Sequence, residues 1–335
     1  MTTTLEMEGF GTPDGQPGTQ IETPSGSIER VAPPVEDRLE FSGPEGKAWR
    51  TATGIVNRFR PVPWLLWVMI RGVYGRSGEI GTPDAMSFSA IEKLLVQAAT
   101  DRTLGKPQDK ENPRSINLQS AISTLGMDVA GALCFIHAVC RRVSTSITDK
   151  VSRPILDDAL LRTHIGYHVG LLSPNCGAGR GMLAGFSGRS GLAILIGAGT
   201  LEQGQKALTG LASGVEISKV CSDVYGCDPL KVAALSLIGG GCSRDIAYGI
   251  ASYNGKTKDI LPGTEQFRWL ALFSVIEHLR MGRNDQISDE FWHELGYDPA
   301  RRAELAEAIQ QSQRRGHGWK WITQPLTPTE EAPKA

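Results

Sequence analysis

The sequence predicts an all-α fold, and three observations lead to this expectation. Apolar residues recur at spacings of three and four along most of the chain, which is the pattern of a helix with one buried face. Sustained alternation of apolar and polar residues, the pattern of a half-buried strand, is absent. Pairs of a capping residue and a proline, which favour helix starts, recur between apolar segments. We therefore expect helices throughout and no strand longer than a few residues.

Individual helices can be located from their stripes and boundaries. The clearest apolar stripes run over residues 91–98, 129–140 and 269–279. Helix starts are expected at Thr82-Pro83, Asp228-Pro229 and Asp298-Pro299, where the first side chain can cap and proline fits the first turn. Helix ends are expected at Gly75, Gly226, Gly239 and Gly282.

The two ends of the chain differ in composition from its middle. Residues 1–35 and 322–335 are rich in Pro, Thr and Glu, and the first segment has almost no large apolar residue after Phe10. Such segments cannot offset the entropy of ordering, so both are predicted to be disordered tails. Residues 36–282 are then one helical domain or two closely joined lobes, about 50–150 and 151–282, with a loop at 109–114 in the first. Residues 283–321 are expected to form a helical appendage, with helices over 287–295 and 299–313.

Charge and hydropathy narrow the classes of partner. The chain has 35 Lys plus Arg and 36 Asp plus Glu, and this balance creates no general attraction to nucleic acid or to an anionic membrane. The first residues lack the basic and apolar regions of a signal peptide. The longest apolar run, 62–70, is about half the ~20 residues that span a bilayer. We expect a cytoplasmic protein whose partners are recognised locally.

Three features resemble functional motifs but fit structural roles better. The six cysteines match neither zinc nor C-x-x-C spacing, so most are expected to be core residues. Residues 192–200 (LAILIGAGT) begin like a dinucleotide-binding turn, but Glu202 stands at the third glycine position and no βαβ unit surrounds them. A buried helix followed by a turn is expected there. Residues 177–181 lack the Lys-Ser/Thr ending of a P-loop and are interpreted as a connector between helices.

Six segments in order suggest a family resemblance. They are 63–66 (PWLL), 88–100, 115–126 (SINLQSAISTLG), 182–191 (MLAGFSGRSG), 225–235 (YGCDPLKVAAL) and 241–250 (GCSRDIAYGI). Together they resemble the HDOD domain, a catalytically silent relative of HD-type metal phosphohydrolases found in bacterial signalling proteins. The third segment is similar to the family's S-I-x-S-L-x-Q-A-I-x-x-L-G, its most specific part. The resemblance implies an all-α HDOD-like fold over about 220 residues.

The departures from the family pattern lie where chemistry is expected. The run 182–191 resembles L-A-G-L-L-H-D-I-G, but Gly188 and Arg189 stand at the metal-binding His-Asp pair. Glycine has no donor side chain, and arginine brings a positive charge. His164 lies near the position of a first HD histidine, and His168 follows one turn later. With no carboxylate partner and no third ligand in view, packing or hydrogen bonding is the expected role of both. No catalytic residue, metal or cofactor is predicted.

The sequence leaves three function hypotheses open. The first is a non-enzymatic signalling, regulatory or scaffolding protein that binds a protein partner, with an acidic segment or an anionic small ligand attracted to Arg189 and assisted by Arg180. His164 and His168 are further binding candidates. The alternative is a divergent metal-dependent phosphohydrolase using His164, His168 and Glu277. The third is a nucleic-acid-binding regulator using the basic and aromatic segment 314–321, although Trp319 and Trp321 are expected to fold back onto the helices.

Overall fold

A computed structural model of the chain describes residues 20–22, 28–30, 43–59, 62, 64–74, 89–101, 103–104, 116–254, 260–315 and 319–323. The predicted boundaries at Gly75 and Thr82-Pro83, the loop at 109–114 and most of both tails lie outside these residues. The described part of the chain is built from helices and one short hairpin, so the predicted all-α fold is confirmed.

The helices and strands have the following bounds. The α-helices are α1 (Gly43–Phe59), α2 (Trp64–Tyr74), α3 (Ser89–Thr100), α4 (Leu118–Leu125), α5 (Met127–Ser146), α6 (Asp149–Leu172), α7 (Ala178–Ala198), α8 (Leu201–Ala212), α9 (Ile217–Tyr225), α10 (Pro229–Gly239), α11 (Arg244–Ala251), α12 (Glu265–Arg280), α13 (Asp289–Glu294) and α14 (Pro299–Arg315). Short 3-10 helices are η2 (Ser252–Asn254), η4 (Asn284–Gln286) and η5 (Trp319–Thr323). The strands β1 (Gln20–Glu22) and β2 (Ile28–Arg30) pair antiparallel.

Local sequence explains where several helices begin and end. Asp228 caps α10 by accepting a hydrogen bond from the Leu230 N–H, with proline in the first turn, as predicted. Asp298 accepts from the Arg301 N–H at the start of α14 in the same way. Gly226 ends α9 with φ of 77°, the left-handed conformation that favours glycine. The predicted helix over 192–198 is the second half of α7.

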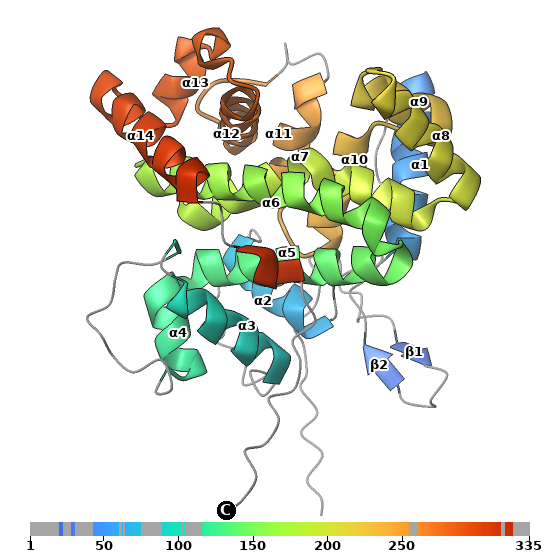
Figure 1. Ribbon diagram of the computed structural model, residues 1–335, viewed down its shortest axis with the longest axis horizontal. Coiled ribbons are helices and arrows are strands. Elements are labelled where there is room, and N and C mark those ends of the chain that lie inside the picture. The colour runs from blue at the N-terminus through green and yellow to red at the C-terminus, as the bar shows by residue number, and fades with distance from the viewer. Residues whose placement is uncertain are drawn as a thin grey trace, which may run out of the picture.

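The antiparallel pair α6 and α7 forms the centre of the fold (Figure 1). On one side α5 packs against α7, and α2, α3 and α4 pack in turn against α5. On the other side α10 and α12 pack against α7, α11 packs against α10 and α12, and α1 packs on α10. The hairpin of α8 and α9 lies at one end of the molecule, and α13 and α14 lie at the other.

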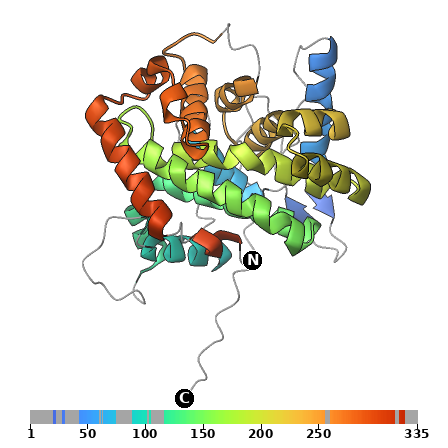
Figure 2. The ribbon, with the colours of Figure 1, turned by 45° about the horizontal axis from the view of Figure 1, so that its top comes forward.

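One hydrophobic core extends through both regions that the sequence allows as separate lobes. Buried residues of both regions, from Trp49 and Leu133 to Ile194 and Phe273, belong to the same cluster. The predicted appendage also contributes to it, because Leu305 of α14 and Trp319 of η5 are buried members. Figure 2 shows α14 and η5 lying along the body of the helical domain. The C-terminal segment therefore completes the core.

Three sequence expectations need correction in detail. The predicted N-terminal tail contains β1 and β2, and the predicted C-terminal tail begins inside η5, whose Ile322 is fully buried. The supposed connector at 177–181 is mostly the first turn of α7, which begins at Ala178. Gly179 and Gly181 permit close helix packing, because a Cβ atom at either position would overlap the backbone of a neighbouring helix.

Helix α7 is long and apolar enough to cross a membrane, but 78% of its most apolar window is buried inside the protein. Among the described residues, α4 and α5 pass the same test only as a pair bent by 107°. A buried central helix of a helical domain has this composition for the same reason as a membrane span, because apolar neighbours surround it.

Candidate functional site

The close packing of α6 against α7 positions the residues around Gly188. In the antiparallel register of this pair, Gly166 lies against Gly181, and Arg162 lies against Gly185 one turn further on. A Cβ atom at any of these glycines would overlap the backbone of the facing helix. Glycine in a helix interior costs ~1 kcal/mol relative to alanine, so close helix contact must offset the intrinsic cost of this sequence.

The same register continues by four residues on each helix to the pair Asp158 and Arg189. Arg189 Nε lies 2.7 Å from Asp158 Oδ2. The Arg189 NH1 group also donates to the Gly188 carbonyl at 2.8 Å. Arg189 therefore makes a structural ion pair with α6. The sequence allowed either this role or contact with a partner.

Gly188 makes room for a buried ion pair between α6 and α12. The Arg162 side chain is 1% exposed, and its NH1 group pairs with Glu277 Oε1. A Cβ atom at position 188 would lie 2.6 Å from that oxygen and 3.2 Å from Arg162 Cδ. A larger residue would have to shift the Glu277 carboxylate, so glycine at the position that the resemblance assigns to a metal-binding histidine leaves space for the ion pair.

Arg280 completes what we call the charge cluster, which consists of Asp158, Arg162, Arg189, Glu277 and Arg280. Arg280 Nε and NH2 lie 2.9 and 2.8 Å from Asp158 Oδ1, and Arg162 Nε lies 3.1 Å from Asp158 Oδ2. Three guanidinium groups and two carboxylates leave one surplus positive charge. These residues do not fit a divalent cation, because each carboxylate is already paired with arginine and the surplus charge repels a metal.

The pKa shifts in the cluster follow from burial and from the neighbouring charges. Burial raises the pKa of Asp158, but the guanidinium groups of Arg162, Arg189 and Arg280 outweigh it, so the pKa lies below its ordinary value. Burial lowers the pKa of Arg189, as does nearby Arg162, while Asp158 and Glu277 raise it. Asp158 is therefore an anion at neutral pH, and Arg189 is a cation short of its usual hydration.

His164 and His168 lie on the opposite side of α6 from the charge cluster. At about 100° per residue, positions 162 and 164 point about 200° apart around a helix. The His164 ring is 4.8 Å from His168 and 4.7 Å from Trp319 between centroids. Arg162, and not His164, is the α6 residue whose side chain lies against Gly188.

We call His164, Tyr167, His168 and Trp319 the aromatic cluster. Their rings meet mostly edge to face, as in the 5.8 Å contact between Tyr167 and Trp319. Burial lowers the pKa of His168 and raises that of Tyr167 to about 12. These contacts support the packing role that the sequence predicts for both histidines.

The two tryptophans of the C-terminal segment fold back onto the helices, as expected. Trp319 is fully buried and donates from Nε1 to Thr103 Oγ1 at 2.7 Å. Trp321 is 9% exposed and donates to Asp101 Oδ2 at 2.9 Å. Neither ring is placed to stack on a nucleobase, so the observation that suggested nucleic-acid binding has a structural explanation.

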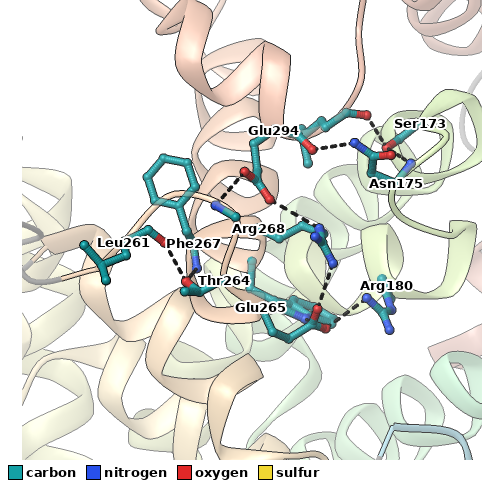
Figure 3. Close-up of polar contacts among 12 residues, drawn as sticks. Ser173, Asn175, Arg180, Leu261, Thr264, Glu265, Phe267, Arg268 and Glu294 are labelled. Atoms are coloured by element: carbon teal, nitrogen blue, oxygen red, sulfur yellow. Dashed lines mark hydrogen bonds and ion pairs between the residues drawn. The ribbon is translucent and has the colours of Figure 1, made fainter.

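Arg180 belongs to a third group of polar residues, near the start of α12 (Figure 3). Its NH1 group lies 2.9 Å from Glu265 Oε1, and Arg268 lies between Glu265 and Glu294. Asn175, in the connection from α6 to α7, donates to the Glu294 carbonyl at 2.8 Å. Arg180 therefore helps to attach α7 to α12. Its partner is Glu265, so the expectation that Arg180 assists Arg189 in binding an anion is not supported by this contact.

The sequence reasoning named Arg189 and Glu277 but missed Asp158, Arg162 and Arg280. The signal was present in two spacings, Asp158 with Arg162 at i,i+4 and Glu277 with Arg280 at i,i+3. Both patterns are common on solvated helix faces, and only the packing of α6, α7 and α12 brings them together. Among the described residues, no three His, Cys, Asp or Glu side chains form a group that could hold a metal ion.

Comparison with known proteins identifies a shared fold. No family model and no curated protein sequence matches the chain. A solved structure of a "putative phosphohydrolase" from Shewanella amazonensis SB2B is similar, with a TM-score of 0.56 and 12% sequence identity. The match covers 82% of this chain and 98% of the other. At this identity the likeness establishes the all-α fold, and the chemistry must be argued from the residues.

Proposed function

We propose that this protein is a non-enzymatic signalling, regulatory or scaffolding protein of the bacterial cytoplasm, built on an HDOD-like scaffold. The observation that carries the proposal is the charge cluster. Where a phosphohydrolase of this family would hold metal ligands, Gly188 adjoins a buried arginine-glutamate pair and Arg189 pairs with Asp158. Three guanidinium groups at this point favour binding of an anion over activation of a metal-bound water.

The working surface in this proposal is the solvent side of the charge cluster. Arg189 and Arg280 are 18% and 35% exposed, whereas Arg162 is buried. A protein partner that presents an acidic segment, or an anionic small ligand, matches the surplus positive charge. His164, His168 and Arg180 are not part of this surface, because their contacts lie elsewhere in the fold.

The structural likeness favours a second candidate, a divergent metal-dependent phosphohydrolase. Its supporting observation is the fold shared with a protein described as a phosphohydrolase. Its best ligand candidates from the sequence were His164, His168 and Glu277. Glu277 pairs with Arg162, while His164 contacts Trp319 on the other face of α6, so this set is not brought together.

Metal content and hydrolysis of phosphate esters separate the two candidates. Purified protein is analysed for Mn, Fe and Zn and then assayed with p-nitrophenyl phosphate and its bis-ester, with and without added Mn²⁺. The proposal expects no stoichiometric metal and no turnover above a matched blank preparation. Activity that is lost in both Glu277→Gln and His168→Ala, with folding intact by circular dichroism, would establish the phosphohydrolase instead.

Partner binding is tested with matched arginine variants. Pull-downs use the full chain, Arg280→Gln at the charge cluster, and Arg302→Gln as control. The Arg302 side chain is about as exposed as that of Arg280, and it pairs with Asp289 outside the charge cluster. A partner that is retained by the control and lost by Arg280→Gln supports the charge cluster as the working surface. A partner retained by both variants assigns binding to another helical face.

A further inference from the structure

The hydrogen-bond donors of the charge cluster outnumber its acceptors. Asp158 accepts at both oxygens, from Arg162 and Arg189 at Oδ2 and from Arg280 at Oδ1. Each guanidinium group has five N–H donors, and one carboxylate offers about four acceptor positions. The described contacts use one nitrogen of Arg189 on Asp158 and one on the Gly188 carbonyl. Among the described residues, the contacts of Arg189 and Arg280 therefore use only some of their N–H donors.

These remaining donors are on the solvent side of the cluster. Arg162 is enclosed between α6, α7 and α12, where it pairs with Glu277 and Asp158. Arg189 on α7 and Arg280 at the end of α12 both reach the same carboxylate from the outside, and both are partly exposed. Asp158 thus pairs with both guanidinium groups, Arg189 at Oδ2 and Arg280 at Oδ1, and part of each arginine side chain remains exposed to solvent.

We propose that Arg189 and Arg280 form a binding site for a phosphate group, with Asp158 as the residue that positions them. This inference rests on the proposed function, because it names the ligand class of the same charge cluster. A phosphate group carries more acceptor oxygens than a carboxylate, so it can accept from both guanidinium groups through different oxygens. The surplus charge of the cluster matches the charge of a phosphodiester or a singly ionised monoester.

Partial burial strengthens the attraction of this site for anions. Charges in a poorly hydrated environment interact more strongly than charges in bulk water. The free energy of dehydrating Arg189 has already been spent in folding, so a phosphate group gains contacts with a preorganised donor. The neighbouring charge of Arg283, which acts with Arg162 and Glu277 on Tyr253, adds to the positive potential at this end of α12.

The test is calorimetric titration of the full chain at constant ionic strength, with chloride as the background anion. Inorganic phosphate, dimethyl phosphate and a short phosphoserine peptide are the three probes. Dimethyl phosphate and the peptide distinguish a small phosphodiester from a phosphorylated protein as the source of the group. The variants are Arg189→Gln and Arg280→Gln, with Arg302→Gln as the matched control.

We expect saturable binding of at least one probe, weakened about tenfold or more by Arg189→Gln and by Arg280→Gln because each removes charge-assisted hydrogen bonds. The Arg302→Gln control should bind as the natural chain does. Should Arg189→Gln unfold, the more exposed Arg280→Gln decides. Binding that is equal in all variants, or absent for all three probes, overturns the site. The outcome is independent of the metal and hydrolysis assays, since turnover would overturn the proposed function while a phosphate site of these arginines could still be measured.

Discussion

The two faces of α6 differ in the kind of side chain that they bury, although Arg162 and His164 are only two positions apart. The face with Asp158 and Arg162 meets α7 and α12, and there buried charges are paired. The face with His164 and His168 meets Trp319 of η5, and there aromatic rings pack edge to face. The charged face retains surplus donors, whereas the aromatic face is closed by the chain itself. A binding function therefore belongs on the charged face.

The largest expected effect is on the aromatic face, from Trp319→Ala. Removing a fully buried tryptophan leaves a cavity beside His164 and should lower the free energy of unfolding by about 3–5 kcal/mol. Chemical denaturation monitored by far-UV circular dichroism measures the change. The matched variant Trp319→Phe keeps a ring but loses the donor to Thr103, so it should cost less. Equal stability of Trp319→Ala and the natural chain would show that η5 is not part of the core.

On the charged face, Arg162→Met should lower the free energy of unfolding by about 3 kcal/mol, because it leaves the Glu277 carboxylate, which is only 14% exposed, without its partner. The double variant Arg162→Met with Glu277→Leu should recover much of this loss, since two apolar side chains of similar size replace the pair. Denaturation of both variants and of Glu277→Leu completes a double-mutant cycle. A cycle with no coupling would contradict the buried pair.

As the pH falls, the histidines near η5 should lose their contribution to the free energy of unfolding before Asp158 of the charge cluster does. Burial lowers the pKa of His168, and burial and Arg141 lower that of His137, against a raising effect of its bond to the Ile322 carbonyl. Because the pKa of each histidine is lower in the folded chain, the unfolded chain binds more protons at acid pH. The contribution of these histidines to the free energy of unfolding is therefore fully present above about pH 6.5 and decreases below it. Each histidine contributes up to about 1.4 kcal/mol per pH unit. The Asp158 contribution is lost only as pH falls below its ordinary value of 3.8 and through its lowered folded-state pKa.

Denaturation midpoints between pH 8 and 5 test this order. His168→Gln should reduce the slope of stability against pH in this range, and Arg162→Met should leave the slope unchanged. A slope that persists in His168→Gln and in the equivalent His137→Gln would assign the acid sensitivity to other groups.

Much of the architecture was predictable because it depends on local pattern. The stripes at 129–140 and 269–279 lie in α5 and α12, and the caps at Asp228 and Asp298 start α10 and α14. The site was predictable only in part. Arg189 was named because it departs from a family pattern, but its partner Asp158 lies 31 positions earlier and belongs to an ordinary i,i+4 pair with Arg162.

By itself, the sequence determined the helical class, several helix boundaries and the absence of donor side chains at Gly188, because these follow from periodicity, capping and residue chemistry. Tertiary structure alone decided which face of α6 meets α7. The glycine contacts set the register of the two helices, and this register brings Asp158 to Arg189 and Arg162 to Gly188. A shift of two residues along α6 exchanges its faces, since successive residues turn by about 100°. That rotation placed His164 with Trp319 and placed the charges together.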